Sequence, residues 1–162
     1  MNSWTPTREK PFTAAELHNQ TRFRLAQMFA AAVLTDPRQR ARYAQAAAGL
    51  DASAHNIAVS DFYHPPIVAD VDLSGYTGRA GEFIRIRAEE GRIGAAQVRV
   101  TIGGRAETPL EEGNASMETD GVTWWYPAQR DLEPDQPLWI TVMAIDQPGN
   151  RTTKTVRHLS GA

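Results

Sequence analysis

The hydrophobic pattern of this chain changes its period at one place, His64-Pro65-Pro66. Before this point apolar residues recur every three to four positions, as in an amphipathic helix, and after it they alternate every second position, as in a half-buried strand. The two prolines also stop a helix here, because proline lacks the N–H that a helix needs and pushes the preceding residue out of the α region. The sequence therefore predicts a helical leader over residues 1–64 and an all-β region over residues 65–162.

The leader contains signals for two or three helices. Thr13 and Glu16 have the spacing of a capping box, which starts a helix that should end near residue 35. Asp36 and Pro37 are an N-cap and a first-turn proline, so a second helix should run to about residue 48. A third is predicted over about residues 52–63. The buried stripe of the first helix is predicted to contain six residues: Leu17, Leu25, Met28, Phe29, Ala32 and Val33.

The region from Pro65 onward predicts about seven strands separated by glycine-containing turns. The strand candidates are residues 67–73, 82–89, 95–102, 108–112, 122–126, 138–146 and 151–159. Their number and the length of the region match an immunoglobulin-like sandwich of about 100 residues. No strand alternates with a helix in this region, which argues against a parallel α/β sheet. The predicted fold class is therefore α+β, with the helical leader followed by the sandwich.

The last two strands carry a family resemblance. Residues 140–152 read Ile-Thr-Val-x-Ala-x-Asp-x-Pro-Gly-Asn-x-Thr, a strand, a Pro148-Gly149 turn and the start of a returning strand. This pattern resembles the last two strands of bacterial immunoglobulin-like domains. Members of that family are chiefly binding or structural modules of surface proteins, so the resemblance implies a role in binding rather than in catalysis.

Alternation along two strands predicts which aromatic side chains face the core. Trp124 points inward, and Trp125 therefore points outward. On the strand at residues 138–146 the outward face carries Trp139, Met143 and Ile145, where polar residues are expected. A long apolar outer face must be covered, either by the helical leader, which we favour, or by a partner or a second copy of the chain.

Composition excludes several classes of function. The chain of 162 residues has no cysteine, so it forms neither disulfides nor thiolate metal sites. A formal net charge of −2 argues against an electrostatically driven nucleic-acid binder. The longest apolar run is far shorter than the roughly 18 residues of a membrane span, and the polar N-terminus does not resemble a signal peptide. We therefore expect a cytoplasmic protein without a membrane span.

Sequence motifs for catalysis or metal binding are largely missing. The histidines are His18, His55, His64 and His158, and no two of them have the i, i+2 or i, i+4 spacing of metal ligands. No serine lies in a Gly-x-Ser-x-Gly elbow. We therefore predict no catalytic residue, no metal and no cofactor.

Three hypotheses for function remain open. The leading one is a non-enzymatic protein-interaction or structural module, which binds a protein partner or a second copy of itself. The alternative is a carbohydrate-binding module that uses exposed tryptophans, and the third is a metal-dependent hydrolase assembled from distant histidines and acids. The candidate binding residues are Trp125, Trp139, Met143 and Ile145.

Overall fold

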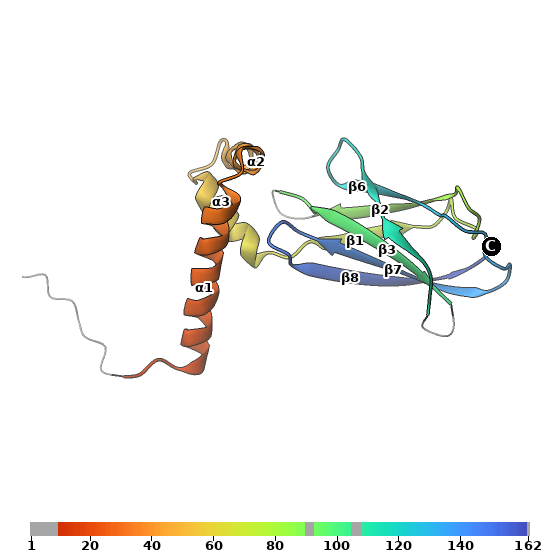
Figure 1. Cartoon of the computed structure of the whole chain (residues 1–162), viewed down its shortest axis with the longest axis horizontal. Coiled ribbons are helices and arrows are strands. Elements are labelled where there is room, and N and C mark those ends of the chain that lie inside the picture. The colour runs from red at the N-terminus through yellow and green to blue at the C-terminus, as the bar shows by residue number, and fades with distance from the viewer. Residues whose placement is uncertain (1–9, 90–92, 105–107, 162) are drawn as a thin grey trace, which may run out of the picture.

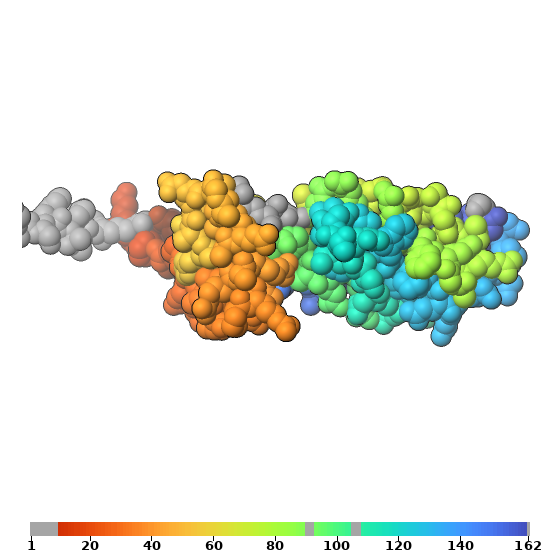
Figure 2. Space-filling model, turned by 90° about the horizontal axis from the view of Figure 1, so that it is seen from above, coloured from red at the N-terminus to blue at the C-terminus, as the bar shows by residue number. Residues whose placement is uncertain are grey.

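The computed structural model describes residues 10–89, 93–104 and 108–161, and these form three helices followed by eight strands in two sheets. Figure 1 shows the helices beyond one end of the β-sandwich, and Figure 2 shows the two parts side by side along the long axis. The predicted α+β fold, with a helical leader followed by a sandwich, is therefore confirmed.

The helices are α1 (Ala14–Val33), α2 (Pro37–Ala47) and α3 (Ala54–Tyr63). Thr13 and Glu16 form the predicted capping box: the Glu16 amide donates to Thr13 Oγ1 and the Thr13 amide donates to Glu16 Oε2. Asp36 caps α2 by accepting hydrogen bonds from the first amides of that helix. The local signals for helix starts thus act as predicted, since side-chain oxygens satisfy amides that have no partner within the helix.

The strands form two four-stranded antiparallel sheets. The first has the order β1 (Ile67–Asp72), β2 (Phe83–Glu89), β6 (Thr123–Pro127), β5 (Ser116–Met117). The second has the order β4 (Pro109–Asn114), β3 (Gln97–Gly103), β7 (Pro137–Ile145), β8 (Arg151–Leu159). Each of the seven predicted strands has a counterpart, and the short β5 is additional.

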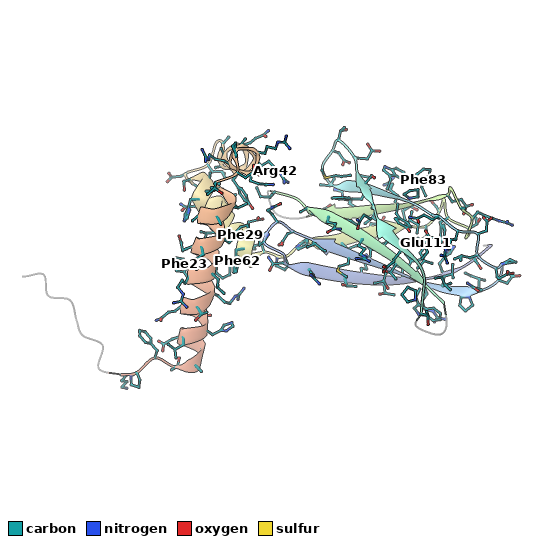
Figure 3. All side chains as sticks on the ribbon, viewed as in Figure 1. Phe23, Phe29, Arg42, Phe62, Phe83 and Glu111 are labelled. Atoms are coloured by element: carbon teal, nitrogen blue, oxygen red, sulfur yellow. The ribbon has the colours of Figure 1, made fainter. Side chains whose placement is uncertain are left out.

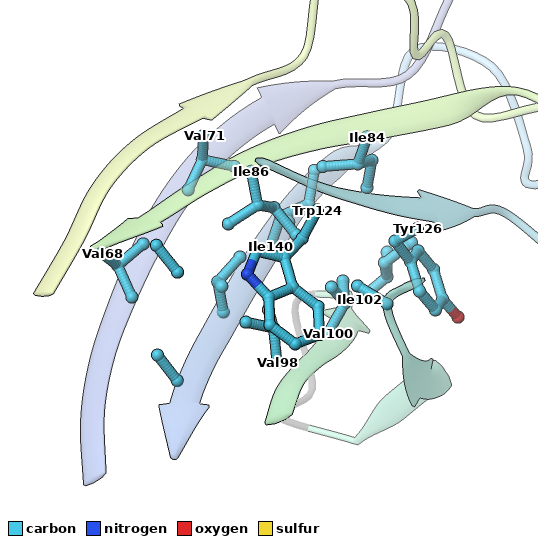
Figure 4. Close-up of a cluster of buried hydrophobic side chains, with 14 of the residues drawn as sticks. Val68, Val71, Ile84, Ile86, Val98, Val100, Ile102, Trp124, Tyr126 and Ile140 are labelled. Atoms are coloured by element: carbon cyan, nitrogen blue, oxygen red, sulfur yellow. The ribbon is translucent and has the colours of Figure 1, made fainter. Parts of the chain in front are cut away.

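The core of the sandwich lies between the two sheets. Trp124 of β6 is 5% exposed and lies among aliphatic side chains of both sheets, with Tyr126 beside it (Figure 4). Strands β2, β3 and β7 bury every second residue, as the alternation predicts. The inward position of Trp124 is therefore confirmed.

The helices have a much smaller core of their own. Its buried members are Ala30, Tyr43, Ile57 and Ala58. The Tyr43 hydroxyl donates a hydrogen bond of 2.6 Å to the buried Asp61 carboxylate. Phe29 and Phe62 pack with ring centroids 6.0 Å apart on the side of α1 that faces the sandwich (Figure 3).

Among the described residues, two hydrogen bonds join the helices to the end of the sandwich. Asn150, in the β7–β8 turn, donates from Nδ2 to the Phe62 carbonyl, and Arg42 of α2 donates to the Ile93 carbonyl ahead of β3. Asn150 also donates to Asp146. Burial raises the pKa of Asp146, and the charge of Asp61 adds to this shift despite the hydrogen bonds from Asn150. The junction therefore brings Asp61 of α3 near enough to Asp146, which follows β7, for their charges to interact.

Strand β8 is a nine-residue edge strand that pairs with β7 over its whole length. Its Lys154 points toward the other sheet and donates from Nζ to the Ala69 carbonyl of β1, at 2.9 Å. Strand β1 is irregular at this point, between Val68 and Asp70. A lysine therefore bridges the two edge strands along the open side of the sandwich.

Candidate binding sites

The outer face of α1 carries a row of large apolar side chains. Leu17, Leu25 and Met28 are 50%, 46% and 61% exposed, and their spacing of eight and eleven residues places them on one side of the helix. We call these three residues the α1 stripe. Phe23, on the side of α1 away from Phe29 and Phe62 in Figure 3, is also exposed. A surface with this many exposed large apolar groups on one helix is a candidate interaction site.

The α1 stripe corrects the prediction for the first helix. The face of α1 that packs on α3 is built around Ala26 and Ala30, with Phe29 and Val33 half-buried. The expected burial of Leu17, Leu25, Met28 and Ala32 is wrong, because all four are exposed. Small alanine side chains let the helices approach closely, and the larger residues are left outside.

One outer face of the second sheet carries Trp139, Met143 and Ile145, as alternation predicts, and we call these three residues the β7 ridge. Trp139, Met143 and Ile145 are each half-buried. Cross-strand neighbours cover part of them, since Met143 pairs with Arg99 and Thr153. The Arg157 guanidinium lies over the Trp139 ring, 5.7 Å from its centroid.

The expectation that the leader covers the β7 ridge is wrong. The helices bond to the β7–β8 turn, which directly follows Ile145. Trp139 lies six residues from Ile145 along the strand, which is about 20 Å in extended chain. The helices lie beyond the end of the strand in Figure 1, so they do not run along the ridge. The side chains that partly cover Trp139 instead belong to neighbouring strands of its own sheet.

A cavity of about 380 Å³ lies against Trp139. The described residues that line it are Thr101, Gly103, Gly104, Pro109, Trp139, Thr141 and Thr155. Gly103 is the direct cross-strand neighbour of Trp139, so no side chain fills the space beside the indole on that strand. The hydroxyls of Thr141 and Thr155 are 3.0 Å apart and hydrogen-bonded. The result is a hollow with an aromatic wall, hydroxyl groups and half-buried glycine backbone.

Trp125 lies on the outer face of the opposite sheet, on β6. Phe83 packs edge-on against it, with ring centroids 6.1 Å apart. A second cavity of about 380 Å³ adjoins both rings, and its lining includes the charged residues Asp72, Glu82 and Arg85. Trp125 and Trp139 therefore do not form one platform, because they belong to different sheets and face in opposite directions.

The acids around the Trp125 cavity are already engaged. Burial alone would raise the pKa of Glu82, but hydrogen bonds from the Arg79, Thr77 and Gly78 amides and the Thr77 hydroxyl lower it. Hydrogen bonds from Ser74 lower the pKa of Asp72. These carboxylates hold the β1–β2 connection in place and stay ionised at neutral pH.

Glu111 is a buried acid that the sequence reasoning missed. It points inward from β4 and accepts hydrogen bonds from the Tyr126 hydroxyl at 2.7 Å and from the Gln129 and Arg130 amides at 2.8 and 3.1 Å. Burial raises the pKa of Tyr126, and the Glu111 bond adds to the shift. Figure 3 places Glu111 in the sandwich, far from the helices. Its hydrogen bonds hold the chain segment that follows β6 in place. Among the described residues, no reactive group lies beside it.

Side chains that bind metal ions are not clustered within the described part of the chain. Residues 10–89, 93–104 and 108–161 contain no cluster of three or more histidines and acids that could hold a metal ion. Two arginines of α2 bind backbone carbonyls of this chain: Arg40 donates to the Leu34 carbonyl and Arg42 to the Ile93 carbonyl. In the same described ranges, the helices are too short or too polar to cross a membrane.

Comparisons with known proteins give distant likenesses. No protein-family model and no curated protein matches the chain. CopC from Methylosinus trichosporium OB3b is similar over 59% of this chain and 92% of its own length, with 14% sequence identity and a TM-score of 0.44. An engineered protein is similar over 60% of this chain, with 16% identity and a TM-score of 0.41, and the match spans 20% of that protein. With both TM-scores below 0.5, function has to be inferred from the surfaces themselves.

Proposed function

We propose that this chain is a non-enzymatic protein-interaction module whose first helix binds in an apolar groove of another protein. The observation that carries the proposal is the exposed α1 stripe of Leu17, Leu25 and Met28. Anchors at i, i+8 and i+11 on one helix face are the pattern by which an amphipathic helix fills a groove. With 20 residues, α1 is about 30 Å long, enough to present all three anchors at once.

Charge on α1 indicates the chemistry of the groove. The helix carries Arg22 and Arg24 but only one acid, Glu16. Arg24 adjoins Leu25. If the α1 helices of two copies of this chain packed together at Leu25, the Arg24 side chains of both copies would therefore lie close to each other. Like charges in an interface cost free energy, whereas an acidic rim around an apolar groove would attract this helix. The occupant we propose is therefore a different protein with an acidic-rimmed apolar groove.

The sandwich serves in this proposal as a rigid immunoglobulin-like platform, with its boundary to the leader at residues 64/65. Its sheet order supports this assignment. The order β1-β2-β6-β5 corresponds to the A-B-E-D sheet of an immunoglobulin domain, and β3-β7-β8 corresponds to C-F-G, with β4 added beside β3.

The test compares the full chain with the double variant Leu25→Glu/Met28→Glu. Both side chains are exposed, so the variant should keep its fold, which circular dichroism checks. Proteins captured from native cells by the wild-type chain are purified and titrated by calorimetry. We expect the double variant to bind at least about tenfold more weakly, and wild-type affinity to fall with added salt.

Met117→Glu is the matched control, because Met117 is about as exposed as Leu17 but lies on β5 of the sandwich. It should leave binding unchanged. Equal affinity of the purified partner for the wild type and the α1 double variant would refute the proposal. A wild-type dimer that the double variant dissociates in light scattering would replace the foreign partner with a second copy.

A further inference from the structure

We propose that the cavity beside Trp139 binds one ring of a neutral pyranose sugar. This site lies on the outer face of the second sheet, away from the α1 stripe, and does not depend on the helix having a partner. A volume of about 380 Å³ lies near the lower end of the roughly 300–1,000 Å³ of small-molecule sites. One or two sugar rings are therefore the size of ligand that it accommodates.

The lining has the two kinds of surface that a sugar ring needs. One face of a pyranose carries mainly C–H groups, which pack against an aromatic ring, and Trp139 supplies that ring. The edges of the sugar carry hydroxyls, which require donors and acceptors. Thr101, Thr141 and Thr155 supply three hydroxyls, and the hydrogen-bonded pair of Thr141 and Thr155 orients two of them.

The described lining residues favour a neutral ligand. Among the described residues that line the cavity, none has an ionisable side chain. Arg157 lies over the indole of Trp139 but does not line the cavity, so its charge holds the ring in place from outside. Among these described lining residues an anionic sugar would find no cation, whereas a neutral one would find hydroxyl partners.

Gly103 creates the space in which the ring would lie. Its backbone is not in the left-handed region, so a side chain is compatible with its conformation. A Cβ added there would meet only the Thr108 and Trp139 carbonyl oxygens, at 3.8 and 3.9 Å, which are ordinary contacts. Valine at residue 103 would therefore fill the cavity while fitting a strand.

The opposite tryptophan is a weaker candidate for the same chemistry. Trp125 has Phe83 packed edge-on against it, and its cavity is lined by Asp72, Glu82 and Arg85. Those charged groups are strongly hydrated and require compensation when a neutral ligand covers them. The site is therefore assigned to Trp139 alone.

The experiment measures sugar binding by the full chain. The probes are neutral methyl pyranosides of glucose, galactose, mannose and N-acetylglucosamine, short neutral oligosaccharides built from them, and glucuronic acid as the charged comparison. Binding is detected by saturation-transfer NMR and quantified by calorimetry, which reach dissociation constants of about 1 mM. We expect saturable binding of at least one neutral probe and none of glucuronic acid.

Three variants locate the site. Gly103→Val should abolish binding, and Trp139→Ala should weaken it about tenfold or more. Thr141→Val keeps the shape of the side chain but removes its hydroxyl, and it should also weaken binding. Trp125→Ala, on the other sheet, should leave binding unchanged, and thermal unfolding verifies that each variant is folded.

Several results would overturn the proposal. The site is not a neutral-sugar site if the wild type binds none of the neutral probes, or binds only glucuronic acid. Binding that survives both Gly103→Val and Thr141→Val, or that is lost in Trp125→Ala, would place the sugar elsewhere. None of these results bears on the α1 stripe, so failure here and failure of the helix proposal are distinguishable.

Discussion

The helical part and the sandwich of this chain differ in the size and composition of their hydrophobic cores. The sandwich buries Trp124, Tyr126 and a row of branched aliphatic side chains from both sheets. The helices bury mainly alanines, with Tyr43 and Ile57 as their only large members among the residues that the structure describes. Apolar burial contributes roughly in proportion to area, so the sandwich carries most of the stability of the chain.

The difference also explains where the binding surfaces lie. The sandwich buries most of its large apolar residues between the sheets, and its exposed ones, such as Ile67 and Met117, lie on different strands. The helices do the reverse, because close packing at Ala26 and Ala30 leaves Leu25 and Met28 in solvent. A part that stabilises itself poorly while exposing large apolar groups is suited to gain order from a partner.

The largest effect should come from separating the two parts. We predict that residues 65–162 alone keep a cooperative β-type circular dichroism spectrum, because their core is complete without the helices. Residues 1–64 alone should lose most of their helix, since the small helical core cannot offset the entropy of ordering the chain. Substantial helix in the 65–162 fragment, or cooperative unfolding of the 1–64 fragment, would contradict the proposed difference in stability between the two parts.

The next effect concerns the core of the sandwich. We expect Trp124→Ala to lower the free energy of unfolding by about 3–5 kcal/mol, because it leaves a cavity the size of an indole between the sheets. Trp125→Ala is the matched control on the same strand, and its half-buried ring should cost much less. Urea denaturation measures both. Equal and large losses would mean that the two faces of β6 are assigned wrongly.

A smaller and more local effect is expected in the helices. Tyr43→Phe removes the hydroxyl that donates to the buried Asp61 carboxylate, which should cost about 1–3 kcal/mol. Hydrogen exchange should quicken in α2 and α3 while β3 and β7 stay protected. Tyr63→Phe, on a half-buried ring that stacks with Arg22, is the control and should change little. A uniform loss of protection in both parts would show that they unfold as one unit.

The smallest effect at neutral pH should appear at Tyr76 of the sandwich. Burial raises the pKa of Tyr76 from 10.0 to about 12, with contributions from the charges of Glu111 and Glu82. Since the folded state holds this proton more tightly than the unfolded state, its contribution is present below about pH 10 and is lost as the pH rises toward about 12.

Tyr76→Phe should reduce this alkaline loss, measured by urea unfolding at a series of pH values. Among the described residues the Tyr76 hydroxyl has no hydrogen-bond partner, so the substitution should be nearly neutral at pH 7. An alkaline loss of the same size in the variant would assign it to another group.

Local patterns predicted the elements well, because their causes are local. Thr13, Asp36 and Ser53 cap helices through bonds to amides two or three residues away. Alternation predicted the buried face of β2, β3 and β7, since a strand in a sandwich has one face in the core. Gly149 in the last hairpin adopts a φ of +94°, as a turn of that composition favours.

Contacts between distant segments could not be predicted in the same way. The hydrophobic stripe of α1 does not show that α3 packs on the alanines, because that choice depends on how closely two helices approach. Alternation placed Trp125 and Trp139 outside but could not assign β6 and β7 to opposite sheets. The hollow beside Trp139 depends on pairing with Gly103, 36 residues earlier in the sequence, which no local pattern reveals.

Glu111 is a position where a sequence signal existed but was not used. It shares the inward face of β4 with Gly113, and an acid at an inward position requires hydrogen-bond partners. A Cβ at Gly113 would lie 3.0 Å from the Tyr126 ring, so the glycine leaves room for the tyrosine that reaches Glu111. An inward-facing acid close to a glycine on the same strand therefore indicates a site where the carboxylate accepts hydrogen bonds from a neighbouring loop.

Lys154 hinders the pairing of strands from other molecules with the open side of the sandwich. Long edge strands expose backbone groups that can pair with a strand of another molecule and grow into fibres. An ammonium group that already binds the Ala69 carbonyl must give up that bond and enter a dry interface before any foreign strand can add to this side. We therefore expect a single cation on the inner face of β8 to disfavour strand-to-strand assembly along this side of the sandwich.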